Sequence, residues 1–301
     1  MSRRAVLPME SYELAQYAVQ VPCYVCERGN SFDAEFCRHC QAPMALSHQA
    51  NAQKAPPQMV ATLGSSGTGK TVYLGMLTDM LSRQSNAMHV LARGAFSISL
   101  QQSTISSLAR CEFPGKTPNE PDRWNWLHCQ VVPSRRRSIE LIMPDPAGES
   151  IMEEIDHPQS YPVVRAFLTK CTAAMLLVDA DELKRGEPQQ DFFAMKIISY
   201  LCELDSDRKN GWPHRPVAVV FTKADQSAAC LSDPGDYAEK HAPGLWRQCH
   251  DRLQNHRFFA VGVAGACAYR ADLGGKTQVP LRIEPHGVAE PFAWLINQIS
   301  K

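Results

Sequence analysis

The segment Gly64-Ser-Ser-Gly-Thr-Gly-Lys-Thr71 constrains the fold of this chain more than any other feature. It fits the pattern G-x-x-x-x-G-K-[ST], between the apolar run Met59–Leu63 and the helical stretch Thr71–Arg83. Glycines at this spacing let backbone N–H groups turn toward phosphate oxygens, and the following helix presents its positive N-terminus. Lys70 would neutralise the β- and γ-oxygens, and the Thr71 hydroxyl would ligate Mg²⁺. We therefore expect a phosphate-binding loop, rather than a chance glycine-rich turn, formed by Gly64, Ser65, Ser66, Gly67, Thr68, Gly69, Lys70 and Thr71.

Downstream, short apolar runs alternate with longer helical stretches. Apolar runs of this kind are typical of strands covered on both faces, as in a parallel sheet. Strands are expected at Met59–Leu63, Ile139–Met143, Ala173–Val178, Val217–Phe221 and Phe258–Val263. Helices are expected at Thr71–Arg83, Phe96–Ala109, Gln190–Leu204, Ala238–Asn255 and Val288–Ser300. Trp124–Val132 and the following strand predict a hairpin, which adds one antiparallel edge strand. The fold class is therefore a doubly wound α/β domain over residues 58–301 with a mostly parallel sheet.

The strand Val217–Phe221 is followed at once by Thr222-Lys223-Ala224-Asp225. A carboxylate at a strand end can accept hydrogen bonds from guanine N1–H and N2–H₂, a donor pair that adenine lacks. The alternative is that Asp225 caps a helix. Together with the phosphate loop, Thr222, Lys223 and Asp225 resemble the guanine-specificity motif [NT]-K-x-D of the TRAFAC-class P-loop GTPases, the Ras-like and translation-factor group. The resemblance implies a P-loop NTPase G domain that binds GTP or GDP.

The segment Asp145-Pro-Ala-Gly-Glu149 follows the strand Ile139–Met143 and resembles the D-x-x-G switch II motif of this family. The resemblance implies that Asp145 holds Mg²⁺ through water and that the Gly148 N–H contacts the γ-phosphate. Glu149 stands where many small GTPases have the glutamine that orients the attacking water. Its carboxylate can accept a hydrogen bond from water but adds negative charge beside the γ-phosphate, so the sign of its effect on rate is open. The alternative is an ordinary Asp-Pro turn.

A switch I threonine that reaches Mg²⁺ and the γ-phosphate should lie upstream of the Trp124–Val132 strand. Thr117 fits that position, and Thr104 is the alternative. Lys70, Thr117, Gly148 and Glu149 are thus the candidate catalytic residues. The segment 82–122 is longer than the corresponding loop of small GTPases and is a candidate partner surface, with an extra helix near Phe96–Ala109.

Two positions depart from the family pattern. Gly262 and Val263 stand where the family usually has Ser-Ala-Lys, although backbone N–H contact with guanine O6 would survive the change. Ser66 replaces a usual glycine and would crowd an incoming arginine finger. The segments Asp145–Glu149 and Phe258–Gly262, with the long insertion, are most similar to the bacterial double-GTPase-type members of the class.

Four of the 11 cysteines are clustered as Cys23-x-x-Cys26 and Cys37-x-x-Cys40. Four thiolates at this spacing predict a closed tetrahedral Zn²⁺ site in a short zinc ribbon, with a redox pair or disulfides as alternatives. Ribbons of this kind usually have glycine after each pair, where this chain has Glu27 and Gln41. The ribbon is expected over 21–44, after an N-terminal segment over 1–20, and the polar stretch 45–57 is expected to be a flexible linker.

Composition limits the function classes. Lys+Arg and Asp+Glu each number 31, so a wholesale electrostatic nucleic-acid binder is disfavoured, while a local basic patch stays possible. No apolar run is long enough for a membrane helix, and the odd number of cysteines favours a reducing cytoplasm. The sequence predicts a Mg²⁺-dependent GTP-binding switch that hydrolyses GTP and docks a protein partner through the ribbon and the 82–122 insertion. A non-hydrolysing GTP-binding scaffold and a nucleic-acid-associated P-loop protein are the alternatives.

Overall fold

The computed structural model describes residues 20–52, 56–83, 88–133, 138–204, 211–272 and 275–300. The N-terminal segment expected over 1–20 lies outside this part of the chain, apart from Gln20. No helix in the described ranges combines the length and the hydropathy that a membrane span requires.

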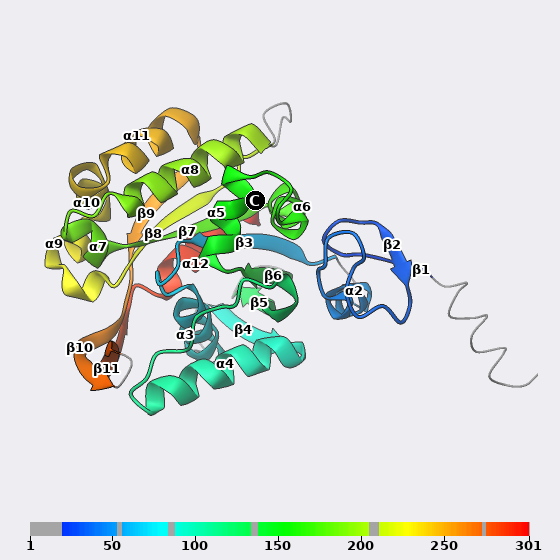
Figure 1. Cartoon of the computed structure of the whole chain (residues 1–301), viewed down its shortest axis with the longest axis horizontal. Coiled ribbons are helices and arrows are strands. Elements are labelled where there is room, and N and C mark those ends of the chain that lie inside the picture. The colour runs from blue at the N-terminus through cyan, green and yellow to red at the C-terminus, as the bar shows by residue number, and fades with distance from the viewer. Residues whose placement is uncertain are drawn as a thin grey trace, which may run out of the picture.

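A seven-stranded sheet forms the centre of the molecule, in the order β4-β5-β6-β3-β7-β8-β9 (Figure 1). Strands β6, β3, β7, β8 and β9 run parallel, which confirms the predicted fold class. The predicted antiparallel strand is β5, and β4, which was not predicted, pairs antiparallel along its outer side. The bounds are β3 (Gln58–Gly64), β4 (Met88–Arg93), β5 (Asn125–Pro133), β6 (Ile139–Asp145), β7 (Ala173–Asp179), β8 (Val217–Thr222) and β9 (His256–Ala260).

Helices cover both faces of this sheet, because its central strands are apolar on both sides (Figure 1). One face packs against α3 (Lys70–Arg83), α4 (Gly94–Ala109) and α12 (Ala289–Ile299). The other packs against α5 (Gly148–Asp156), α6 (Pro162–Lys170), α7 (Ala180–Lys184), α8 (Gln189–Leu204), α9 (Ala228–Ser232), α10 (Pro234–His241) and α11 (Pro243–Arg252). Two 3₁₀ turns, η1 (Pro121–Arg123) and η2 (Ala224–Gln226), lie in loops. The parallel strands therefore all end at one edge of a sheet buried on both faces.

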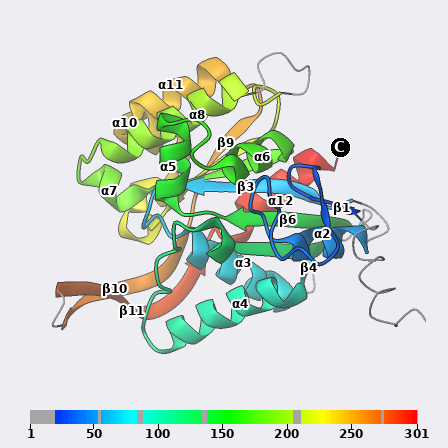
Figure 2. The same ribbon diagram turned by 45° about the vertical axis from the view of Figure 1, so that its right-hand side comes forward.

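Two local expectations need correction, and one hairpin was not predicted. The helix expected over Ala238–Asn255 is divided, because Pro243 has no N–H to continue α10 and instead starts α11. The strand expected over Phe258–Val263 ends at Ala260, after which the chain enters β10 (Gly262–Asp272). This strand pairs with β11 (Gly275–His286) in an antiparallel hairpin that was not predicted. The hairpin extends away from the body of the domain (Figure 2).

Residues 20–52 form a Cys-rich unit made of β1 (Gln20–Pro22), β2 (Gly29–Ser31) and α2 (Met44–Asn51). The flexible linker expected over 45–57 is wrong over its first half, where α2 is an ordered helix. Met44 and Leu46 are fully buried, so the stretch carries enough apolar surface to pack although its composition is mostly polar and small.

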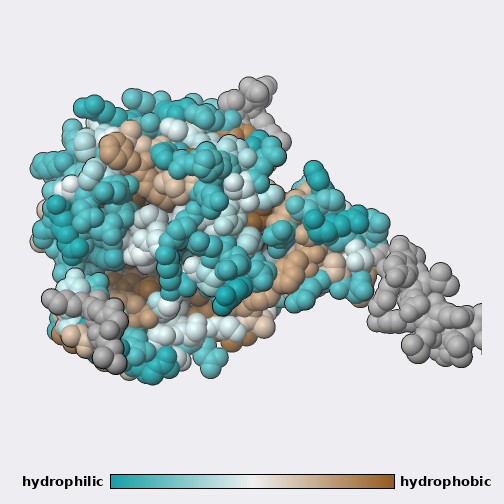
Figure 3. Space-filling view, viewed as in Figure 1, coloured by the Kyte–Doolittle hydropathy of each residue, from teal (hydrophilic) through white to brown (hydrophobic). Residues whose placement is uncertain are grey.

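The Cys-rich unit packs directly on the G domain. Met44 and Leu46 belong to the same buried cluster as Trp126 of β5 and Ile142 of β6. At its edges, Gln49 Oε1 lies 3.1 Å from His128 Nδ1, and Lys170 Nζ lies 3.1 Å from Glu27 Oε1. Figure 3 shows apolar side chains where the unit meets the larger domain. The unit and the G domain therefore share one hydrophobic core.

Candidate nucleotide-binding site and metal centre

The loops after β3, β6 and β8 converge on one cavity of about 340 Å³ at the carboxyl edge of the sheet. Parallel sheets of this class bind ligands at this edge. Figure 3 shows a recess with apolar side chains at this end of the molecule, beside the β10–β11 hairpin. The predicted residues that line the cavity are Ser66, Gly67, Thr68, Gly69, Lys70, Thr71, Thr117, Gly148, Glu149, Thr222, Lys223, Asp225 and Val263.

The remaining residues predicted for nucleotide and Mg²⁺ binding contact residues that line the cavity: Gly64, Ser65, Asp145 and Gly262. A Cβ on Gly64 would lie 2.8 Å from both the Leu177 carbonyl oxygen and Thr68 Oγ1, so only glycine fits between β3 and β7 here. Gly67 and Gly69 have φ values of +77° and +84°, in the region that glycine adopts without strain. The loop before α3 thus has the backbone conformation that its glycine spacing predicts.

Lys70 is 6% exposed, and its ammonium donates hydrogen bonds to the carbonyl oxygens of Gly64 (2.9 Å) and Ser65 (3.0 Å). Burial lowers the pKa of Lys70, and the nearby Asp145 carboxylate opposes that shift. The lysine is therefore a buried cation held by the loop itself, at the place where phosphate oxygens would meet it.

Thr71, Thr117 and Asp145 lie together although they come from α3, the loop before β5 and the end of β6. The Thr71 hydroxyl donates to Asp145 Oδ2 at 2.7 Å, and Thr71 Oγ1 lies 3.2 Å from Thr117 Oγ1. Burial raises the pKa of Asp145, and its Oδ1 is buried without a hydrogen-bond partner. An orphaned carboxylate oxygen beside two hydroxyls fits the oxygen ligands that Mg²⁺ prefers.

Thr104, the alternative switch I threonine, lies elsewhere. Its side chain packs under α3, where a Cβ on Gly75 would lie 2.3 Å from Thr104 Oγ1. Thr104 is fully buried in that contact and does not line the cavity. The geometry therefore favours Thr117.

Gly148 and Glu149 begin α5 against the phosphate loop. A Cβ on Gly148 would lie 2.4 Å from the Ser66 backbone nitrogen, so the D-x-x-G glycine is required by close approach. Glu149 forms an ion pair with Lys116. Partial burial raises the pKa of Glu149, but the hydrogen bonds from Lys116 and Ser66 outweigh this effect and hold the pKa below its usual value.

At the other end of the cavity, Lys223 has a left-handed backbone (φ 54°) that places Asp225 at the wall. A Cβ on Gly262 would lie 2.8 Å from Asp225 Oδ1, so the departure from Ser-Ala-Lys at this position leaves room for the carboxylate. The Thr222 hydroxyl donates to the Val178 carbonyl oxygen at 3.2 Å and joins β8 to β7. Thr222 therefore has a structural role in addition to its place in the wall.

Sequence reasoning missed a buried network behind the phosphate loop. Gln190 of α8 exchanges hydrogen bonds with the Ser65 hydroxyl at 2.9 and 3.1 Å, and its amide also donates to Glu182. Asp179, at the end of β7, pairs with Lys223 and accepts from the backbone of α7. A carboxylate at the end of a buried strand is a detectable signal for Asp179, whereas nothing in the sequence singles out Gln190.

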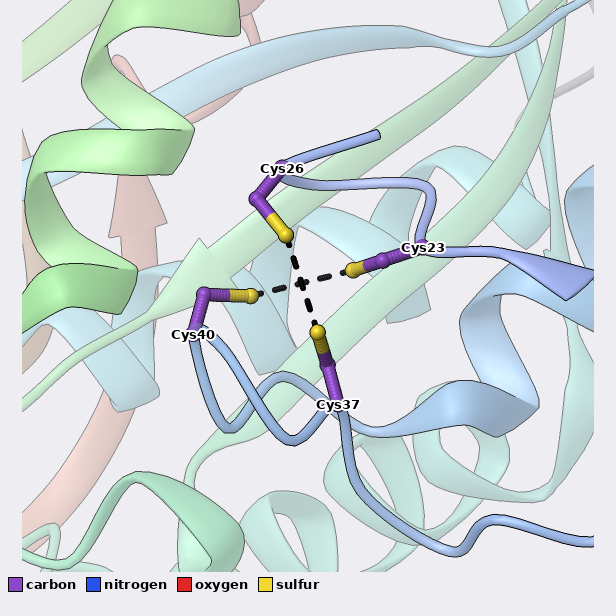
Figure 4. Close-up of side chains that lie close together, drawn as sticks. All are labelled: Cys23, Cys26, Cys37 and Cys40. Carbon is purple, nitrogen blue, oxygen red and sulfur yellow. Dashed lines mark hydrogen bonds between the residues drawn. The ribbon is translucent and has the colours of Figure 1, made fainter. Parts of the chain in front are cut away.

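The four clustered cysteines point toward a common centre (Figure 4). All four sulfurs lie within 4.8 Å of one another, with Cys23 Sγ–Cys40 Sγ at 3.7 Å and Cys26 Sγ–Cys37 Sγ at 3.6 Å. Four sulfurs placed tetrahedrally about 2.3 Å from one ion would be about 3.8 Å apart. These spacings are far too long for disulfide bonds. The cluster therefore fits one Zn²⁺ ion. The four sulfurs would fill all four coordination positions and leave none open for catalysis.

A family model described as Double-GTPase 2 matches residues 58–266. The comparison with curated proteins gave no match. Among solved structures, the Arl6 (BBS3) small GTPase of Trypanosoma brucei with bound GppNp is 14% identical. It covers 81% of this chain and 98% of its own, with a TM-score of 0.43. The GTPase-like domain of Ski7 from S. cerevisiae, bound to GDP and inorganic phosphate, is 16% identical. It covers 84% of this chain and 52% of its own, with a TM-score of 0.44.

Proposed function

The chain belongs to the Double-GTPase 2 family, and from this premise we propose that it is a Mg²⁺-dependent GTP-binding protein that hydrolyses GTP and acts as a nucleotide-controlled switch. One observation carries the proposal. The phosphate loop, the Asp145–Glu149 segment and the Thr222–Asp225 segment, widely separated in sequence, line or directly support one cavity. That is the arrangement a guanine nucleotide requires, with phosphates at one end and base at the other.

Each end of the cavity has a distinct role in binding. The backbone N–H groups of the phosphate loop and the Lys70 ammonium would bind the β- and γ-phosphates. Asp225 would accept hydrogen bonds from guanine N1–H and N2–H₂. Thr71, Thr117 and Asp145 would hold Mg²⁺, which when bound neutralises charge on the phosphate oxygens. The chain would thereby position and orient GTP, and its side chains would take little part in covalent chemistry.

Turnover by the isolated chain should be slow. Glu149 occupies the position from which a side chain would orient water, but its carboxylate places a negative charge there, which Lys116 has to offset. Ser66 lines the cavity where an arginine supplied by a partner would enter. Electrostatic stabilisation of the transferred phosphoryl group supplies most of the rate of this reaction. The negative charge of Glu149 and the side chain of Ser66 both weaken that stabilisation, so they limit the rate of GTP hydrolysis.

A switch function follows from where the γ-phosphate contacts lie. Thr117 belongs to the loop after α4, and Gly148 begins α5. Loss of the γ-phosphate would release both segments. We propose that a protein partner reads this change through the 82–122 insertion and the outward side of the Cys-rich unit, where Phe32 is 51% exposed. The inward side of that unit is covered by the G domain.

The cysteine chemistry supports a cytoplasmic setting. All 11 cysteines are free thiols, seven of them outside the metal cluster. Burial raises the pKa of Cys129, Cys230 and Cys249 to about 12, which keeps these thiols protonated and unreactive.

Single-turnover hydrolysis of Mg²⁺·GTP by the purified chain, with ATP as competitor, tests the proposal. Hydrolysis that resists excess ATP and is lost in Lys70→Ala is the expected result. Equal competition by ATP would contradict guanine binding, and hydrolysis retained by Lys70→Ala would show that a contaminant is responsible.

A second candidate is a non-hydrolysing GTP-binding scaffold. The Glu149 carboxylate favours it, because a negative charge at this position opposes the charge that develops on the γ-phosphate, and Lys116 offsets that charge without removing it. Tight, ATP-resistant GTP binding without turnover in the same assay would support this candidate, and multiple turnovers would exclude it.

A further inference from the structure

The β10–β11 hairpin forms a wall of the nucleotide cavity, although none of its residues after Val263 belongs to a recognised motif. Ala264 and Cys267 of β10 and Gln278 of β11 line the same cavity as the phosphate loop and Asp225. The hairpin pairs with no strand of the central sheet in the described part of the chain. Its position is therefore set by contacts at its base and along one face.

Strand geometry places Cys267 and Gln278 on one side of the hairpin. Tyr269 is the partner of Gln278 in the ladder, and Cys267 lies two residues before Tyr269. Residues two apart on a strand share a face, and so do directly opposed residues. The cavity-facing side therefore continues outward to Tyr269, which is 61% exposed.

Two contacts hold the hairpin beside the cavity. At the root, Gly262 abuts Asp225, since a Cβ there would lie 2.8 Å from Asp225 Oδ1. Further out, on the other face of the hairpin, Arg270 Nη2 lies 3.7 Å from Glu112 Oε1, just before the Phe113–Thr117 segment, which also lines the cavity. Burial raises the pKa of the Cys267 thiol, and the negative charge of Asp225 adds to this effect, which fits a thiol close to the base-reading carboxylate. The hairpin thus connects the base end of the cavity to the switch I loop.

We infer that the β10–β11 hairpin is a binding element for the nucleoside end of the ligand, in which Cys267 packs against the guanine base and the Gln278 amide hydrogen-bonds the base edge or a ribose hydroxyl. The inference rests on the proposed function, because the ligand is a guanine nucleotide. It assigns binding to a segment that follows the last family motif.

Nucleotide release measures the Gln278 contact. The full-length, zinc-loaded protein is loaded with a fluorescent GDP analogue and chased with unlabelled GDP. Gln278→Ala should release the analogue about 3- to 10-fold faster, as expected for one lost hydrogen bond. Thr277→Ala is the matched control, because Thr277 is the exposed neighbour on the opposite face of β11, and its release rate should stay within about twofold of the parent.

Thiol protection tests the Cys267 contact without substituting any residue that lines the cavity. In a Cys111→Ser background, which removes the exposed thiol, alkylation of Cys267 by N-ethylmaleimide is followed by peptide mass spectrometry. Saturating GDP should slow this alkylation roughly tenfold by covering the thiol, whereas ADP should not.

The two results must agree for the inference to hold. Faster release from Gln278→Ala together with GDP protection of Cys267 supports it. If the parent protein binds GDP but either effect is missing, the hairpin inference is overturned while the proposed function stands. If the parent protein binds no guanine nucleotide, the proposed function fails and the inference fails with it.

Discussion

Lys116, in the loop before β5, forms an ion pair with Glu149, the second residue of α5. The pair joins the two segments that carry Thr117 and Gly148, both beside the phosphate end of the cavity. Both side chains are partly exposed, so the pair alone contributes little to stability, on the order of 0–1 kcal/mol. Its importance lies in the positive charge that it places beside the Glu149 carboxylate, next to the proposed γ-phosphate position.

We expect Lys116→Ala to slow single-turnover GTP hydrolysis by about 3- to 10-fold, because the Glu149 charge is then uncompensated near the phosphates. In a Glu149→Gln background the same substitution should have a much smaller effect, so the two changes should be strongly non-additive. Lys196→Ala, which breaks a 2.7 Å pair with Asp156 at the other end of α5, is the control. Additive effects of Lys116→Ala and Glu149→Gln would contradict this role.

Asp225→Asn should weaken GTP binding by about 30- to 1,000-fold, since it replaces a charged acceptor of two hydrogen bonds, worth roughly 2–4 kcal/mol together. ATP binding should change little, so the preference for GTP over ATP should fall. Competition titrations with both nucleotides measure this. Asp236→Asn, on the exposed surface of α10, should leave the preference intact. An unchanged GTP affinity would mean that the base lies elsewhere.

Gly148→Ala should displace the phosphate loop, because the new methyl carbon would lie 2.4 Å from the Ser66 nitrogen and 2.5 Å from the Ser65 carbonyl carbon. Overpacking of this kind costs about 1–3 kcal/mol in the free energy of unfolding. GTP affinity should fall in parallel, as measured by nucleotide titration alongside chemical denaturation. Gly235→Ala, where the nearest atom would be 3.3 Å away, should be nearly neutral. A Gly148→Ala protein with parental affinity would disprove the close approach.

Metal analysis should find about one zinc ion per chain, and Cys37→Ser should remove it. The apolar cluster of the Cys-rich unit is continuous with Trp126 and Ile142, so zinc loss should also lower the melting temperature of the G domain. Cys111→Ser, an exposed cysteine outside the cluster, should keep both the zinc and the melting temperature. A G-domain transition unaffected by zinc removal would show that the two parts unfold independently.

Gln41→Gly should stabilise the Cys-rich unit, because Gln41 has a φ of +64°. Relieving a left-handed non-glycine residue is worth about 0.5–1 kcal/mol in the free energy of unfolding. Glu27→Gly should give a smaller gain, since Glu27 has a φ of +65° but also pairs with Lys170. Glu35→Gly is the control and should destabilise, because Glu35 has no positive φ. Thermal denaturation of the zinc-loaded proteins measures all three, and a loss of stability in Gln41→Gly would contradict the argument.

Local sequence patterns predict the fold class and the candidate binding residues at the carboxyl edge of the sheet. Apolar runs such as Ala173–Val178 are stable only when they are buried on both faces of a sheet. The G-x-x-x-x-G-K-T spacing places glycine at positions 67 and 69, where the backbone has a positive φ. The cysteine spacing likewise predicted a four-sulfur cluster. In each case the pattern that supports the prediction lies within one short segment of the sequence.

Contacts between residues that are far apart in the sequence depend on how the whole chain folds. Thr117 rather than Thr104 reaches Thr71 because the chain folds back between α4 and β5, a path no local pattern specifies. Gln190 lies behind Ser65, although the two are 125 positions apart in the chain. The apolar face of α2 is too short to be recognised from the composition of the segment, but it packs against side chains of β5 and β6. The strands of the β10–β11 hairpin are neither strictly alternating nor wholly apolar, and only the folded chain brings Cys267 and Gln278 to the cavity.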